Sequence, residues 1–104
     1  MFGYNNLVSD MRSLVVLKEN DCPVVYDASH SVQRPGASNG ASSGDRRYIS
    51  PLAKAATAVG IDALFIESHP DPSSAISDGD NCININDIEG LLKEVIKIHN
   101  AVKN

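Results

Sequence analysis

The 104-residue sequence has no tryptophan, only two cysteines and no long apolar run. A transmembrane helix needs about 20 consecutive apolar residues, so we expect no membrane span. The first residues also lack the basic and apolar segments of a signal peptide. Cys22 and Cys82 show neither CxxC nor zinc-finger spacing. Two such thiols without a signal peptide favour a reducing compartment over a disulfide, so we expect a cytoplasmic protein.

Positive charge is also scarce. Nine lysines and arginines face 13 aspartates and glutamates, which leaves a net charge of −4. With this charge balance, the protein has no overall positive electrostatic potential that would attract nucleic acid, although a local phosphate site is compatible with it. A length of 104 residues with 42% hydrophobic residues suits one small domain, spanning 1–104.

Two short apolar runs end in the same way. The run 23–26 is followed by Asp27 and His30, and the run 63–66 is followed by Glu67. Both runs are short and rich in β-branched or aromatic residues, which predicts parallel strands at 23–27 and 63–67, covered on both faces. Because α/β folds place their chemistry at the carboxyl ends of strands, the two endings indicate one active site.

Helical spacing of apolar residues predicts three helices, at 5–19, 47–59 and 87–102. Gly60 is suited to end the second helix, and Asn86 to cap the third. The polar segment 29–45 is predicted to be a long loop.

The resulting order, α-β-α-β-α with parallel strands, is incomplete as a sheet. Two strands make a poor sheet, and a (β/α)₈ barrel takes about 250 residues and eight strands. We therefore predict an α/β protein that forms the C-terminal part of a TIM barrel. That part comprises about the last two strands and three helices, without the N-terminal strands.

Three side chains are candidates for chemistry: His30, Glu67 and Asp78. An imidazole with two carboxylates suits a divalent cation such as Mn²⁺, Fe²⁺ or Zn²⁺. The same groups can also manage protons without a metal. The structural alternative is that each strand-end side chain only bonds to its own loop.

For each of the other polar residues near the strand ends, the sequence allows a functional role and a purely structural one. Asp27 can orient the imidazole of His30 or cap its own loop. His69 can serve the site or bond to the loop backbone. Arg46 and Arg47 begin a helix, where a phosphate can bind, but a solvated pair of charges is nearly as natural there.

Four runs carry a family resemblance: 2–8, 27–33, 65–72 and 77–79. They resemble the 3-deoxy-D-manno-octulosonate 8-phosphate synthase family, whose corresponding stretches read FGYNNLV, DATHSVQ, F-ETHPDP and SDG. The match runs in order over nearly the whole chain. The related deoxyheptulosonate phosphate synthases share the barrel and the chemistry but differ around the strand-end histidine.

The resemblance implies a (β/α)₈ barrel transferase that condenses phosphoenolpyruvate with D-arabinose 5-phosphate and water. The products are an eight-carbon sugar-acid phosphate and phosphate, a step toward the lipopolysaccharide core. It also implies that His30, Glu67 and Asp78 are catalytic and hold one divalent metal ion, Mn, Fe or Zn, unless the protein is of the metal-independent form. Gln33 and Arg47 would bind substrate, the segment 29–45 would cover the site, and the protein would be a homo-tetramer.

The sequence departs from the family at Ser29, Arg34 and Asp80, where threonine, an apolar residue and proline are usual. The family's fourth metal ligand and the side chains that hold the phosphoenolpyruvate phosphate have no counterpart in these 104 residues. We therefore expect no turnover by this polypeptide alone. Two alternatives remain: a non-catalytic remnant or interaction module that packs its sheet edges on a partner, and a fragment of a related deoxyheptulosonate phosphate synthase.

Overall fold

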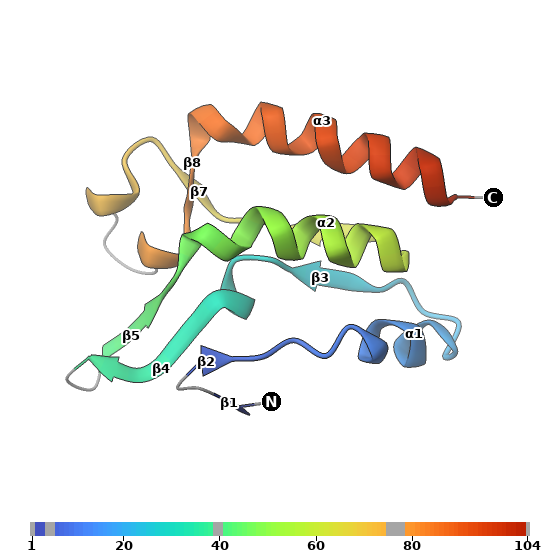
Figure 1. The fold of residues 1–104 in the computed structure, drawn as a ribbon, viewed down its shortest axis with the longest axis horizontal. Coiled ribbons are helices and arrows are strands. Elements are labelled where there is room, and N and C mark those ends of the chain that lie inside the picture. Colours follow the sequence, from blue (N-terminus) through green and yellow to red (C-terminus); the bar gives the residue numbers. More distant parts are fainter. Residues whose placement is uncertain (1, 4–5, 39–40, 75–78, 104) are drawn as a thin grey trace.

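The computed structural model describes residues 2–3, 6–38, 41–74 and 79–103. Its centre is a pair of strands; in the view of Figure 1, the two long helices lie above this pair and the N-terminal elements below it. The central elements are β3 (Val25–Asp27), β6 (Ala63–Phe65), α2 (Ile49–Val59) and α3 (Ile85–Val102). No helix of the described ranges is long and apolar enough to cross a membrane.

The central strands β3 and β6 are parallel and in register, which confirms the predicted pairing. Tyr26 lies opposite Leu64, and Asp27 opposite Phe65. Just before the first pair of the ladder, the Asp62 carboxylate accepts the backbone N–H of Val24 at 2.8 Å and joins the two strands there. Both strands are shorter than predicted, because the ladder begins at residue 25 and ends at residue 65.

The core lies on one face of this strand pair. Tyr26 is buried there against α2, whose residues Ile49, Ala53 and Ala56 are fully buried. Alanines let the helix approach the sheet closely, as their spacing predicts. The opposite face is open: Val25 is 58% exposed and Phe65 45%. The expectation that both faces are covered is therefore wrong for the described residues, because helices pack on one face only.

Helix α2 begins later than predicted and ends where predicted. A 3₁₀ turn, Arg46–Tyr48, precedes it, so the α-helix starts at Ile49. Gly60 ends it at a φ of 115°, where its N–H donates to the carbonyl of Ala56 at 3.1 Å. This conformation disfavours any residue with a Cβ, which explains the glycine.

Helix α3 starts two residues earlier than predicted. Its cap is Asn84, whose side-chain oxygen accepts the N–H of Asn86 at 2.9 Å. An Asn-x-Asn sequence offers two equivalent caps, and the sequence alone does not choose between them. The helix lies along α2, to which it is joined by an ion pair between Lys54 and Glu94. Leu91 is its buried contact with the core.

The predicted N-terminal helix at 5–19 is largely wrong. Of the described residues in that range, only α1 (Arg12–Lys18) is helical, while β1 (Phe2–Gly3) and β2 (Asn6–Leu7) form an antiparallel pair. Asp10 accounts for the late start. Its carboxylate accepts the Arg12 N–H at 3.0 Å and its carbonyl accepts the Ser13 N–H at 3.0 Å, so Asp10 satisfies the first N–H groups of the helix and fixes where it begins. The bonded guanidinium lowers the pKa of Asp10.

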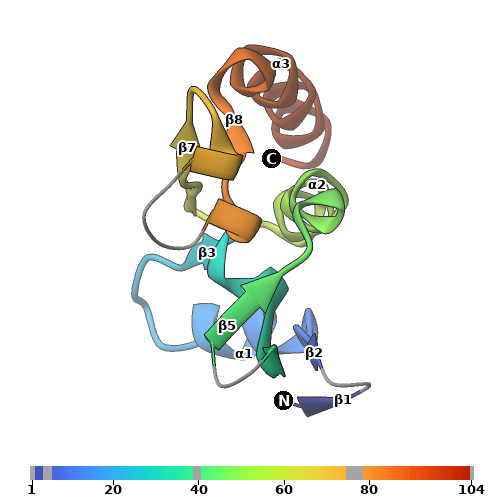
Figure 2. The ribbon, with the colours of Figure 1, turned by 90° about the vertical axis from the view of Figure 1, so that its left-hand side faces the viewer.

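The segment 29–45 is also more ordered than predicted. It contains a 3₁₀ turn, His30–Val32, and a hairpin of β4 (Gln33–Ser38) and β5 (Ala41–Gly44). The hairpin extends from the body of the molecule (Figures 1 and 2). Its glycines and serines give no apolar alternation, so the strands leave no signal in the sequence.

Replacing Gly60 by alanine should lower the free energy of unfolding by about 1 kcal/mol or more, because a Cβ is strained at its positive φ. Gly90→Ala is the matched control. Gly90 lies within α3, where an added Cβ meets nothing within 4 Å, so this change should raise the same free energy by up to about 1 kcal/mol. Urea unfolding measures both, and equal effects of the two changes would contradict the assigned helix end.

Candidate functional site

The two strand endings meet, as the sequence predicts. Because Asp27 and Phe65 are partners in the ladder, the residues just beyond them converge. His30 Nε2 lies 3.4 Å from Glu67 Oε1, with the two side chains 35% and 33% exposed. Solvent and small molecules can therefore reach a pair formed by residues 37 positions apart in the chain.

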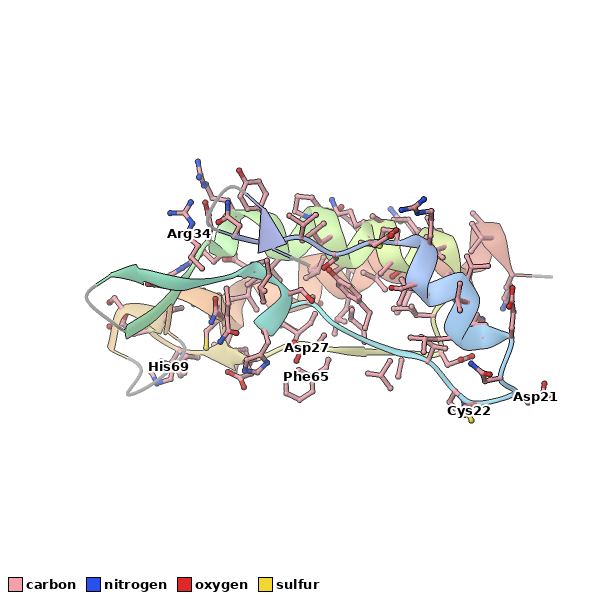
Figure 3. The ribbon with its side chains drawn as sticks, turned by 90° about the horizontal axis from the view of Figure 1, so that it is seen from below. Asp21, Cys22, Asp27, Arg34, Phe65 and His69 are labelled. Carbon is pink, nitrogen blue, oxygen red and sulfur yellow. The ribbon has the colours of Figure 1, made fainter. Side chains whose placement is uncertain are left out.

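Asp27 determines how His30 is presented. Its Oδ2 lies 2.7 Å from His30 Nδ1, and its Oδ1 accepts the backbone N–H groups of Ser29 and His30. Where Nδ1 donates to this carboxylate, Nε2 faces Glu67. The ring also lies 5.9 Å from that of Phe65, which projects from the sheet on the side away from α2 (Figure 3).

Glu67 is held through its backbone. Its N–H donates to the buried Ser29 Oγ at 2.6 Å, and its carbonyl accepts the N–H of Ile83 at 3.0 Å. Beyond it, β7 (Ser68–His69) pairs in parallel with β8 (Ile83–Asn84). Glu67 therefore sits at a junction where three segments of the chain meet.

Two neighbours of Glu67 were missed as site residues by the sequence reasoning. Ser29 is noted there only as a departure from threonine, yet it joins the two strand ends. Cys82 is 5% exposed, and its Sγ lies 3.8 Å from Glu67 Oε2. No spacing rule connects positions 67 and 82, so the sequence could not have predicted that Cys82 lies at the site. Ser29 could have been considered, because it directly precedes His30.

The donor chemistry fits a cation in part. In the tautomer with its proton on Nδ1, Nε2 offers a lone pair beside that of a carboxylate oxygen, so a proton or a metal ion can lie between them. His30 and Glu67 are thus two donors in one place. Asp78, the third predicted ligand, lies outside the described residues. Among those described, no three His, Cys, Asp or Glu side chains form a candidate metal site.

The other predicted site residues lie at the base of the hairpin. Gln33 begins β4, and its N–H donates to the carbonyl of His30. Arg47 pairs with Asp45, donating from Nε at 2.8 Å. That bond lowers the pKa of Asp45 to about 2 and raises the pKa of Arg47. Arg34 joins the same carboxylate at 3.2 Å.

Arg46 and His69 bind local groups. Arg46 Nη2 donates to the carbonyl of Gly79 at 3.2 Å and lies 3.7 Å from Asp80, so it ties the hairpin base to the turn before Cys82. His69 Nδ1 accepts the N–H of Asp71 at 2.9 Å. The structure thus contains the loop-backbone bond that was one of the two readings of His69.

Ser29→Ala should lower the free energy of unfolding by roughly 1–3 kcal/mol, because it leaves the Glu67 N–H without its acceptor. Ser29→Thr keeps the hydroxyl and should cost less. Ser73, an exposed serine, is the control: Ser73→Ala should stay within about 0.5 kcal/mol. Amide hydrogen exchange at Glu67 measures the bond directly, and unchanged protection in Ser29→Ala would contradict it.

Asp45 should contribute stability that depends on pH. Its pKa is lowered from 3.8 to about 2 by the hydrogen bond from Arg47, so the folded state gains from the ionised form above about pH 4. That gain disappears as the pH falls from about 4 to about 2. The difference in unfolding free energy between the wild type and Asp45→Asn should shrink over this window.

The cause can be checked separately by carbon NMR of the Asp45 carboxyl. In Arg47→Gln the hydrogen bond from Nε is absent, so the pKa of Asp45 should rise toward its usual range. An unchanged titration in this variant, or parallel pH profiles in the unfolding experiment, would contradict the assignment.

Comparison with curated proteins finds close relatives. The chain is 57% identical over 102 residues to a 2-dehydro-3-deoxyphosphooctonate aldolase of Desulfotalea psychrophila, which covers 98% of this chain and 36% of the relative. A protein of that name from Legionella pneumophila is 60% identical over 90% of this chain, which spans 34% of that relative. One from Xylella fastidiosa is 54% identical over 98% of this chain, which spans 37% of it. The chain thus spans about a third of the length of these relatives.

Solved structures agree on the fold. A crystal structure of phospho-2-dehydro-3-deoxyheptonate aldolase (DAHP synthase) from Thermotoga maritima superposes with a TM-score of 0.79 at 28% identity, covering 97% of this chain and 27% of that one. A truncated form of 3-deoxy-D-arabino-heptulosonate 7-phosphate synthase from Thermotoga maritima gives 0.78, covering 35% of its chain. The model of the DAHP synthetase I family matches residues 1–104. The chain belongs to the DAHP synthetase I family.

Proposed function

We propose that this chain supplies part of the active site of a 3-deoxy-D-manno-octulosonate 8-phosphate synthase. The complete enzyme would condense phosphoenolpyruvate with D-arabinose 5-phosphate and water, releasing phosphate. The observation that carries the proposal is the pairing of His30 with Glu67 at two adjacent strand ends. Relatives at 54–60% identity, named 2-dehydro-3-deoxyphosphooctonate aldolase, support this choice of reaction.

The chain is proposed to form the C-terminal part of a (β/α)₈ barrel, with residues 1–104 as an incomplete domain. Helix α2 covers one face of β3 and β6, as a barrel helix covers its strands from outside. The open face with Val25 and Phe65 would then belong to the barrel interior. Superposition on DAHP synthase at a TM-score of 0.79 supports this arrangement.

His30 is proposed as the group that handles protons. When no metal is bound, Nδ1–H stays bonded to Asp27 and Nε2 can accept a proton from the water that adds to carbon 2 of phosphoenolpyruvate. Carbon 3 of the enol attacks the aldehyde carbon while this water adds at carbon 2, and the aldehyde oxygen takes up a proton to become a hydroxyl. The bond between carbon 2 and the phosphate oxygen then breaks, the added hydroxyl at carbon 2 gives up its proton to form the ketone, and phosphate leaves. Glu67 lies beside Nε2 and stabilises the imidazolium that results.

His30 and Glu67, with Asp78 as third donor, are the residues that would hold one divalent metal ion. A bound Mn²⁺, Fe²⁺ or Zn²⁺ supplies positive charge that orients water and aldehyde. In a metal-independent form, the proton that Nε2 accepts from water takes this place between the two side chains. Both forms need the same spacing of His30 and Glu67.

Substrate phosphate and enzyme assembly are the remaining parts of the proposal. Asp45 engages Arg47 at Nε and Nη2, so a phosphate would bind the guanidinium from its Nη1 side, with Gln33 near the substrates. By family, we propose a homo-tetramer in the cytoplasm.

A second function is favoured by one observation, the exposed apolar side chains of Val25 and Phe65. A module that binds a partner through its sheet would present such a face. A deoxyheptulosonate phosphate synthase fragment has weaker support, since the identity to that enzyme's structures is 28%.

A chimera tests the proposal. The matching third of the Desulfotalea enzyme is replaced by this chain, and phosphate release from phosphoenolpyruvate and arabinose 5-phosphate is measured. We expect turnover by the chimera and none by the 104 residues alone. His30→Ala should reduce the rate at least about 100-fold, whereas His99→Ala, at an exposed position of α3, should not change it.

Three results would contradict the proposal. A folded chimera that releases no phosphate would show that these residues cannot form the site. Full activity of the His30→Ala chimera would remove the role given to the imidazole. Phosphate release by the isolated chain would show that the missing two thirds are not required.

A further inference from the structure

We propose that Cys82 is a positioning residue for Glu67: its thiol donates a hydrogen bond to Oε2 and keeps Oε1 turned toward His30. This inference rests on the proposed function, in which Glu67 acts beside His30. The two oxygens of one carboxylate are divided between the neighbours, with Oε1 3.4 Å from Nε2 and Oε2 3.8 Å from Sγ.

The backbone brings Cys82 to this place. The residue after it, Ile83, donates its N–H to the Glu67 carbonyl at 3.0 Å, and the Cys82 N–H donates to the carbonyl of Gly79 at 3.3 Å. Both bonds fix the chain on either side of the Cys82 side chain, which is 5% exposed. The thiol therefore has little freedom to leave the Glu67 carboxylate.

Glu67 needs such a neighbour. Ser29 and Ile83 hold only its backbone, while its side chain is a third exposed and has three rotatable bonds. A thiol is a weak donor, but an ionised carboxylate strengthens the hydrogen bonds it accepts. One such bond changes an equilibrium by roughly two- to tenfold.

The geometry argues against Cys82 as a metal ligand. Its Sγ lies against the carboxylate oxygen that does not face His30. The described side chains also contain no three-residue donor group that includes a cysteine. Cys82 thus acts through Glu67.

Infrared spectroscopy of the S–H stretch tests the bond in the full chain. Cys22, the exposed cysteine, lies far from Asp27 (Figure 3). Cys22→Ser removes its thiol, so that the S–H band of Cys82 is the only one that remains. In this background Glu67→Gln should move the band to higher frequency, because the acceptor loses its charge. Glu89→Gln, at an exposed glutamate of α3, is the matched control and should leave the band in place.

The infrared result decides on the bond whatever the activity of the protein. A band that Glu67→Gln leaves unmoved would overturn the proposal. A band that moves equally in both glutamate variants would overturn it too, because the response would not come from the neighbouring carboxylate.

Mn²⁺ binding to the chimeric barrel tests the positioning. Cys82→Ala should weaken Mn²⁺ binding roughly two- to tenfold, and Cys82→Ser, which keeps a donor on the same Cβ, should restore it to within about twofold. A chimera that releases phosphate but keeps its Mn²⁺ affinity in Cys82→Ala overturns the proposal. A chimera without phosphate release counts against the proposed function instead, and the infrared band then decides on Cys82.

Discussion

The short parallel ladder between β3 and β6 is the constraint on which the rest of the site depends. Its register places Asp27 opposite Phe65, and the Ser29 hydroxyl extends the connection by accepting the N–H of Glu67 at 2.6 Å. Because the period of a strand is two residues, a slip of one position would turn every side chain to the other face. The distance between His30 and Glu67 is therefore a consequence of register.

The sheet is covered on one side only, and this shapes how the chain can act. Helix α2 buries Tyr26 through its alanines, whereas Val25 and Phe65 stay exposed on the other face. In a barrel that face would be closed by further strands, which is why the proposed enzyme needs the rest of a barrel around these residues. The same exposed side chains make association through the sheet the natural competing function.

Prediction from the sequence was most accurate where a pattern reports directly on burial. The two parallel strands follow from short continuous apolar runs, the second and third helices follow from apolar periodicity, and Gly60 follows from the need for a positive φ. Elsewhere local bonds override the pattern: Asp10 delays the first helix, and two equivalent asparagines precede the third. The hairpin at 33–44 escaped notice because its residues show no apolar alternation.

The sequence by itself determined which chemical groups stand at the strand ends, since Asp27, His30 and Glu67 follow short apolar runs whose length and β-branched or aromatic residues favour strands. It also determined the family, through motifs that extend over the whole chain. Tertiary structure alone decided which of these groups touch. It joined Cys82 and Ser29 to Glu67 and directed Arg47 to Asp45, because contacts between distant positions depend on register and turn geometry, which no local pattern encodes.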